Sequence, residues 1–197
     1  MIRYQWMERL IDASERDLPA LAVELARLHL ADNPDDYAGL MLYAGALVDL
    51  ARYPEARAAL EHALTLARPD KRVSVLRRLG ELCDALYEAR EAERYYREAI
   101  AAAPNDASAH IFLGALLART GRLEEAESVH RQATLCLVGE IDEAYLNLGL
   151  VQRGRGDYVG ALSSLRRALE LDPAYSAAQD ALRDVESLLF QFPAPEA

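Results

Sequence analysis

The chain is poor in cysteine, in long apolar runs and in segments that direct export. Cys83 and Cys136 are its two cysteines among 197 residues, too few for a disulfide framework. Both fall within helical apolar patterns, so we expect free, buried thiols in a reducing cytoplasm. No window approaches 18 uninterrupted apolar residues, and no basic start precedes an apolar stretch at the N-terminus. We therefore expect a cytoplasmic protein with neither a signal peptide nor a membrane span.

Basic charge is also scarce. Lys71 is the single lysine, and the 22 basic residues face 32 acidic ones, which gives a formal net charge of -10 at pH 7. Nucleic-acid binding requires a basic surface that displaces counterions, and anionic membranes attract basic segments. The composition therefore argues against nucleic acid and against membranes as partners.

Glycine and proline are few, and they punctuate longer segments. The ten glycines and eight prolines mostly separate stretches rich in Ala, Leu, Glu and Arg, which is the composition of an all-α protein. Hydrophobic residues make up 52% of the chain and charged residues 27%, so a sizeable core is possible and disorder is not expected.

Apolar residues recur at helical spacing in pairs of segments. In the pair between Asp142 and Pro173, Gly154 and Gly156 break the first helix and Asp157 is placed to cap the second. The remaining pairs are expected at 2–14 with 18–31, 37–50 with 54–67, 73–87 with 91–103, and 107–120 with 123–137. One further helix is expected at 176–190.

Small residues recur in register from pair to pair. Three slots repeat with a period of about 34 to 36 residues, which indicates a helical repeat array. The second helices carry Ala56, Ala92, Ala126 and Ala161, and two turns later Ala63, Ala99, Ala133 and Ala168. The first helices carry Ala44, Gly80, Gly114 and Gly149, and four pairs close at Pro34, Pro69, Pro104 and Pro173.

At these positions the chain resembles the tetratricopeptide repeat (TPR) family. One repeat matches the family pattern at Tyr145, Leu148, Gly149, Ala161, Leu165, Ala168 and Pro173, and departs from it at Gln152. Another matches at Leu76, Leu79, Gly80, Cys83, Ala92, Tyr96, Ala99 and Pro104. The resemblance implies an all-α, right-handed superhelical solenoid of about five helix hairpins with a C-terminal capping helix.

The expected domain is a single solenoid over residues 1–190. Its repeats are expected at about 2–36, which is degenerate, then 37–72, 73–106, 107–141 and 142–175, followed by the capping helix at 176–190. Residues 191–197 are expected to form a flexible tail. The alternative is that Phe190 and Phe192 dock in a groove of this chain or of a neighbour.

No catalytic constellation stands out in the sequence. It contains no Gly-rich phosphate loop, no H-E-x-x-H or H-x-x-E-H, no C-x-x-C and no G-x-S-x-G. We therefore predict no catalytic residue, no cofactor and no metal site. His110 and His130 fall in facing slots of the fourth pair, but a metal would need further ligands. The simpler interpretation is that both replace aromatic residues and form local hydrogen bonds.

The resemblance implies that the first helix of each pair lines a concave groove. The expected groove residues are Met41, Leu42, Gly45, Val48, Arg77, Arg78, Glu81, Asp84, Ile111, Phe112, Ala115, Asn147, Leu150 and Arg153. Large apolar residues on such a face indicate a partner surface. If the face assignment is wrong by one residue, Met41, Leu42, Ile111 and Phe112 belong to the core instead.

The resulting hypothesis is a non-enzymatic scaffold that holds another protein. Chaperone-binding members of the family grip a C-terminal carboxylate through a basic residue followed by asparagine. Here the residue one helical turn after Arg77 is Glu81, and the residue one turn after Met41 is Gly45, so neither position carries asparagine. An extended peptide or an amphipathic helix is therefore the more plausible ligand. The alternatives are a secretion-type chaperone, as in small bacterial proteins with similar repeats, and a homo-oligomer assembled through the terminal helices. A catalytic role has no support from motifs.

Overall fold

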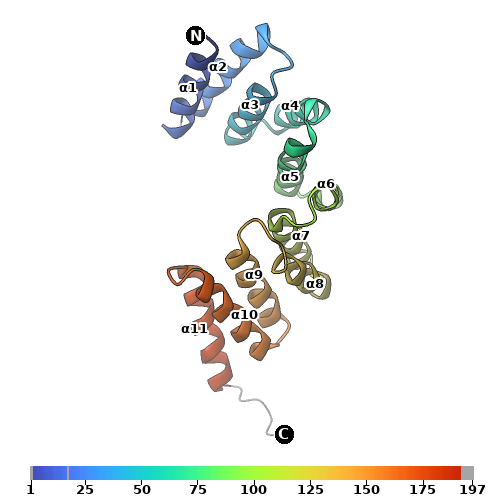
Figure 1. The fold of residues 1–197 in the computed structure, drawn as a ribbon, viewed down its shortest axis with the longest axis vertical. Helices are drawn as coiled ribbons and strands as arrows, with labels where there is room; N and C mark the ends of the chain where they lie inside the picture. Colours follow the sequence, from blue (N-terminus) through green and yellow to red (C-terminus); the bar gives the residue numbers. More distant parts are fainter. Residues whose placement is uncertain (1, 17, 192–197) are drawn as a thin grey trace. The chain divides into compact units, whose positions relative to one another are not determined.

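The computed structural model describes residues 2–16 and 18–191. This part of the chain contains eleven α-helices and no β-strand (Figure 1). The helices are α1 (Ile2–Glu15), α2 (Pro19–Asp32), α3 (Tyr37–Asp49), α4 (Tyr53–Leu66), α5 (Pro69–Ala85), α6 (Ala89–Ala102), α7 (Ala107–Arg119), α8 (Leu123–Ala133), α9 (Ile141–Gly154), α10 (Tyr158–Leu171) and α11 (Ser176–Gln191). The all-α prediction is confirmed. The tail predicted after Gln191 lies outside the described residues.

The helices belong to two compact units, residues 1–102 and residues 103–197. Unit 1 contains α1 to α6 and unit 2 contains α7 to α11. In each unit consecutive helices pack as hairpins: α1 with α2, α3 with α4 and α5 with α6 in unit 1, and α7 with α8 and α9 with α10 in unit 2. The expectation of one solenoid over residues 1–190 stays a prediction.

Alanine and glycine allow the two helices of a hairpin to approach closely. The eight alanines predicted in the second helices are all fully buried. In three hairpins a side chain of the second helix crosses directly over a glycine of the first: Tyr96 over Gly80, His130 over Gly114 and Leu165 over Gly149. A Cβ atom at any of these glycines would lie less than 3.0 Å from the crossing side chain. The predicted repeat register is therefore confirmed.

The turn inside each of the four later hairpins has the same geometry. One residue adopts a positive φ, and the next residue's N–H donates to the carbonyl five residues back over 2.8–2.9 Å, which is the Schellman arrangement. The positive-φ residues of unit 1 are Ala51 (56°) and Tyr87 (61°), whereas those of unit 2 are Gly121 (80°) and Gly156 (82°).

Two helix boundaries differ from the prediction by four residues, at the start of α5 and at the end of α8. Pro69 begins α5 instead of ending the preceding pair, because proline fits the first turn of a helix, where its missing N–H would have no partner. The helix α8 ends at Ala133 rather than near Leu137. The N–H groups of Leu137 and Val138 both donate to the carbonyl of Asn105, which takes this segment out of the helix.

The last helix closes unit 2. On its inner side α11 buries Ala178, Ala181 and Val185 in a cluster that includes Leu146 of α9 and Leu165 of α10. Its outer side carries the exposed residues Gln179, Asp180, Arg183, Asp184, Glu186 and Ser187. A polar outer face of this kind is what an array needs at its end.

Candidate protein-binding site

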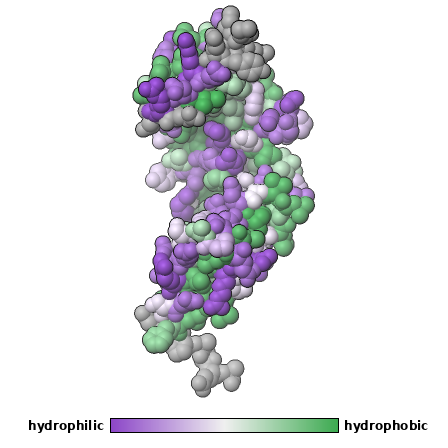
Figure 2. All heavy atoms as spheres, turned by 60° about the vertical axis from the view of Figure 1, so that its left-hand side comes forward, coloured by the Kyte–Doolittle hydropathy of each residue, from purple (hydrophilic) through white to green (hydrophobic). Residues whose placement is uncertain are grey.

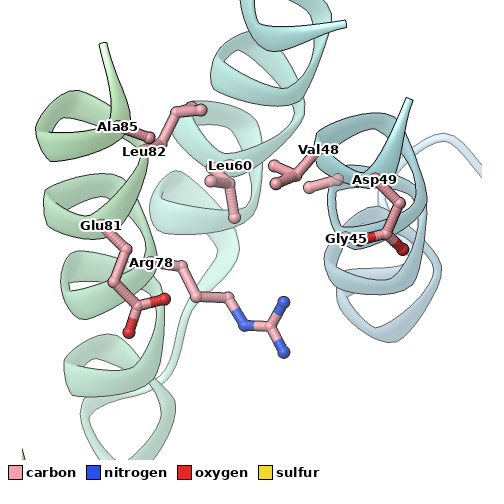
Figure 3. Close-up of a pocket in the computed structure, with 9 residues that line it drawn as sticks. Gly45, Val48, Asp49, Leu60, Arg78, Glu81, Leu82 and Ala85 are labelled. Carbon is pink, nitrogen blue, oxygen red and sulfur yellow. The ribbon is translucent and has the colours of Figure 1, made fainter. Parts of the chain in front are cut away.

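A hollow of unit 1 lies among α3, α4 and α5 (Figure 3). It has a volume of about 350 Å³. Its lining consists of small and aliphatic residues with three charged ones, namely Ala44, Gly45, Val48, Asp49, Leu60, Arg78, Glu81, Leu82 and Ala85. We call this hollow the unit 1 pocket. An apolar pocket with a few polar groups is the usual form of a binding site.

The pocket has a buried aliphatic floor and a more exposed rim. Leu60 and Leu82 are almost fully buried, at 2% and 3% exposure, whereas Val48 is 37% exposed at the rim. Gly45 has no side chain to fill the space, and a Cβ there would meet only the Arg78 guanidinium, at 3.5 Å. The hollow is therefore open because α3 carries glycine where α5 approaches.

Charge is distributed unevenly around this floor. Figure 3 shows the Arg78 side chain extending from α5 toward α3, below the aliphatic residues. Its neighbour Arg77 pairs with Glu81, but Arg78 is exposed and forms no ion pair within residues 2–16 and 18–191. Asp49 lies across the pocket on α3. Arg78 is therefore available to a ligand as a bidentate donor.

Four of the predicted groove residues gather in the unit 1 pocket: Gly45, Val48, Arg78 and Glu81. Four others from the same unit, Met41, Leu42, Arg77 and Asp84, are half-buried and do not line it. Sequence reasoning missed Asp49, Leu82 and Ala85, although each stands four residues after a predicted position and so shares its helix face. It also missed Leu60, because it considered only the first helices.

The predicted groove residues of unit 2 are less open. Ile111 was expected to face the groove, but it is 5% exposed and packs with Ala107, Ala133 and Ala144. Ile111 therefore belongs to the core, as the alternative face assignment predicted for it. Its side chain fills the contact between α7, α8 and α9. Phe112 is half-buried, and Ala115 is exposed.

The positions on α9 are partly occupied by neighbours. Leu150 packs against the cluster that α11 completes, and Arg153 donates to Asp184 of α11 at 2.7 Å. The capping helix α11 therefore uses part of the surface that was expected to face a ligand. Asn147 lies beside Glu143: burial and the nearby Glu140 raise the pKa of Glu143, and a hydrogen bond with Asn147 opposes this shift.

The two histidines of the fourth hairpin have different surroundings. His110 Nδ1 lies 3.0 Å from the carbonyl oxygen of Asp106, the local bond that the sequence suggested. His130 is buried over Gly114, and its Nδ1 has no hydrogen-bond partner in the described structure. Burial lowers the pKa of His130 to about 4. Within residues 2–16 and 18–191, no three His, Cys, Asp or Glu side chains gather as a metal site.

The thiols also differ from each other. Burial raises the pKa of Cys83 to about 11 although Arg57 lies nearby, so this thiol stays protonated and unreactive. Cys136 was expected within a helix, but it follows the end of α8 and is half-buried. Burial and Asp106 raise its pKa.

A second hollow lies in unit 2 between α8, α9 and α10, and sequence reasoning missed it. Its volume is about 790 Å³, and polar residues such as Arg131, Arg167 and Ser163 line much of it. Inside it Ser164 donates to Gln152 Oε1 at 2.7 Å. The signal was the departure of Gln152 from the family's aromatic residue, because a buried amide requires a polar partner.

On the face drawn in Figure 2, hydrophobic and hydrophilic side chains are interspersed. In the described residues we find no helix with the length and apolar character needed to cross a bilayer.

Comparisons with known proteins agree with the fold. Family models described as tetratricopeptide repeat match residues 76–135 and 142–175. A comparison with curated protein sequences finds no match.

Three similar solved structures illustrate the likeness. YrrB, described as a TPR protein with an unusual peptide-binding site, has a TM-score of 0.64 and 21% identity over 90% of both chains. TTC0263, a TPR protein of Thermus thermophilus, has a TM-score of 0.70 and 18% identity, covering 93% of this chain and 98% of its own. MamA from Desulfovibrio magneticus has a TM-score of 0.69 and 22% identity, covering 87% and 96%. At these identities the likeness concerns the fold.

Proposed function

The chain is a tetratricopeptide repeat protein, and from this premise we propose that it is a non-enzymatic scaffold that holds an extended peptide or an amphipathic helix of another protein. The TPR fold supports protein binding in general. YrrB, described as having an unusual peptide-binding site, supports a peptide as the kind of ligand. A chaperone-like role in secretion and a cytoplasmic location stay predictions.

The observation that carries this proposal is the unit 1 pocket. Its aliphatic floor of Val48, Leu60 and Leu82 suits an aliphatic side chain, since burial of such a group stabilises a complex by roughly 1.5–3 kcal/mol. Arg78, which has no ion pair of its own in the described structure, suits a carboxylate or carbonyl group next to that side chain. The preferred ligand is therefore a segment with an aliphatic anchor beside a hydrogen-bond acceptor.

Two substitutions test the pocket separately from the fold. Gly45→Leu fills the hollow, and it should not lower the melting temperature because leucine favours a helix more than glycine does. Arg78→Glu reverses the free charge. We expect each variant to capture the native partner from a lysate of the source cell at least about tenfold less efficiently than the wild type.

Arg90→Glu is the matched control. Arg90 is also an exposed arginine of unit 1, but it lies on α6 and does not line the pocket. We expect it to capture the partner as the wild type does. Unchanged capture by both pocket variants, or equal loss in the control, would refute the assignment of the pocket.

A further inference from the structure

The first half of α5 is basic, although the chain as a whole is acidic. Residues 68–78 carry one acidic side chain and five basic ones, whereas the whole chain has a net charge of -10. The basic residues are Arg68, Lys71, Arg72, Arg77 and Arg78. Arg77 is half-buried and pairs with Glu81, and the other four are exposed. A local excess of positive charge on an acidic protein indicates a surface that attracts anionic groups.

Lys71 and Arg78 share the face of α5 that lines the unit 1 pocket. They are seven residues apart, which is about two helical turns and about 10 Å along the helix. The Lys71 ammonium lies 3.9 Å from the exposed carboxylate of Asp70, a contact that contributes little. Arg78 has no ion pair in the described part of the chain. Both charges are therefore available to a ligand. We call Lys71 and Arg78 the basic track.

Helix α3 runs alongside the basic track. The hydroxyl of Tyr37, in the first turn of α3, donates to the Lys71 carbonyl at 3.5 Å. A Cβ atom at Gly45, about two turns later, would lie 3.5 Å from the Arg78 guanidinium. Burial raises the pKa of Tyr37, the positive charge of Arg78 lowers it, and Asp70 raises it, so the Tyr37 side chain lies near Arg78 as well. The track therefore continues from the unit 1 pocket toward the first turns of α3 and α5.

The other end of the pocket is acidic. Asp49 lines the pocket one turn after Gly45, on the side away from Lys71. It is exposed and has no ion pair among the residues that the structure describes. Glu81, the other acidic residue of the lining, is already paired with Arg77. The charges that a ligand meets therefore change from positive beside the first turns of the two helices to negative beyond Gly45.

We infer that the segment held by the unit 1 pocket is acidic on one side of its aliphatic anchor, with aspartate or glutamate side chains over Arg78 and Lys71. The inference rests on the proposed function, because it requires the anchor to occupy the pocket. An extended peptide advances about 3.3 Å per residue, so three residues span the basic track. The carboxylates are those of side chains, so the end of the partner chain need not lie near the pocket. The Arg78 guanidinium suits such a carboxylate because it can donate two parallel hydrogen bonds.

The charge of the whole chain predicts the opposite preference. A protein with a net charge of -10 attracts basic peptides and repels acidic ones. A preference for an acidic peptide must therefore come from local charges, which makes peptide charge a sharp test of the basic track.

The experiment is isothermal titration calorimetry of the full chain with short peptides that are acetylated and amidated, so that no terminal charge contributes. Each peptide has a leucine between two glycines, with three glutamates on one side and three serines on the other. Both chain orders are used, with the glutamates before or after the leucine. Matched peptides carry glutamines or lysines in place of the glutamates.

In at least one order the glutamate peptide should bind about five- to tenfold more tightly than the glutamine peptide, and the lysine peptide should bind more weakly than both. Added salt should reduce this ratio. Lys71→Gln and Arg78→Gln should each reduce the ratio at least about twofold. Arg72→Gln is the matched control, because it removes the same charge one residue later but about 100° further round the helix. The ratio should be retained in that variant.

Equal binding of the glutamate and glutamine peptides in both orders would overturn the inference, as would an equal effect of Arg72→Gln and Lys71→Gln. Absence of binding by every leucine peptide up to about 1 mM would overturn it too. These outcomes are distinct from those of the proposed function. Gly45→Leu should weaken the glutamate and glutamine peptides alike, because it fills the space for the leucine. If Gly45→Leu lowers partner capture but glutamate gives no advantage, the pocket stands and its acidic preference fails.

Discussion

The two units make the same hairpin turn with different residues. Unit 1 places Ala51 and Tyr87 at positive φ, whereas unit 2 places Gly121 and Gly156 at the equivalent positions. The hydrogen bonds of the turn are the same in both units. Because a side chain at positive φ costs roughly 1–2 kcal/mol, the turn geometry is imposed by the packing of the helices. Glycine accommodates this geometry without creating it.

The first test adds a large side chain where the two helices of a hairpin pack most closely, a contact that both units share. Gly80→Leu in unit 1 and Gly114→Leu in unit 2 each place a large side chain against a ring that already leaves no room for a Cβ atom. We expect each to lower the free energy of unfolding by about 3 kcal/mol or more. Chemical denaturation measures this loss. A loss of under about 1 kcal/mol at either site would contradict the common register.

The second test uses pH to distinguish the contact of His130 with Gly114 in unit 2 from the contact of Tyr96 with Gly80 in unit 1. His130 has a pKa of about 4 in the folded chain against an ordinary value of about 6.5. Its neutral form therefore favours the folded state above pH 6.5, and this contribution is lost as the pH falls toward 4. We expect unit 2 to lose about 2 kcal/mol of unfolding free energy between pH 7.5 and 4.5. His130→Phe should remove that loss.

Tyr96→Phe is the matched control for the histidine. Tyr96 occupies the same slot in unit 1 over Gly80, and a tyrosine does not titrate between pH 4.5 and 7.5. The pH dependence of this variant should match the wild type. A pH dependence in His130→Phe equal to that of the wild type would show that other groups are responsible.

The third test concerns the turns of unit 2. Gly121→Ala and Gly156→Ala introduce a side chain at a φ of about 80° in open surroundings, since nothing lies within 4 Å of either added Cβ. Backbone strain alone should lower the unfolding free energy by about 1 kcal/mol each. The loss should appear in the thermal transition and as faster hydrogen exchange in α7 to α10.

The fourth test is the reciprocal change in unit 1, with the smallest effect. Tyr87→Gly relieves a positive φ at a side chain that is 92% exposed, so little packing is lost. We expect a gain of about 0.5 kcal/mol, because the greater freedom of glycine in the unfolded chain offsets part of the relief. A destabilisation of more than about 1 kcal/mol would mean that Tyr87 makes a contact worth more than the strain.

Features set by local spacing were predictable from the sequence. The alanines at 92 and 99 and the glycine at 80 recur at fixed distances, so the hairpin register followed from their size alone. The boundary of α8 depends instead on Asn105, whose carbonyl accepts two N–H groups from a segment about 32 residues away. Helical periodicity contains no information on such a bond.

The candidate site was predictable only in part, for a similar reason. Gly45, Val48, Arg78 and Glu81 lie on the expected faces of α3 and α5 and line the unit 1 pocket. Ile111 lies on the corresponding helix of unit 2, but the contact of α7 with α8 and α9 buries it. The spacing of residues predicts which of them share a helix face. Whether that face is buried depends on how the neighbouring helices pack against it.

The early start of α5 has a practical consequence. Because the helix begins at Pro69, Lys71 belongs to it and stands seven residues before Arg78, two turns away on the same face and about 10 Å distant. Lys71 is exposed, and it is the single lysine of the chain. Once the thiols and the N-terminal amine have been blocked, an amine-reactive fluorophore would thus attach beside the unit 1 pocket and report its occupancy.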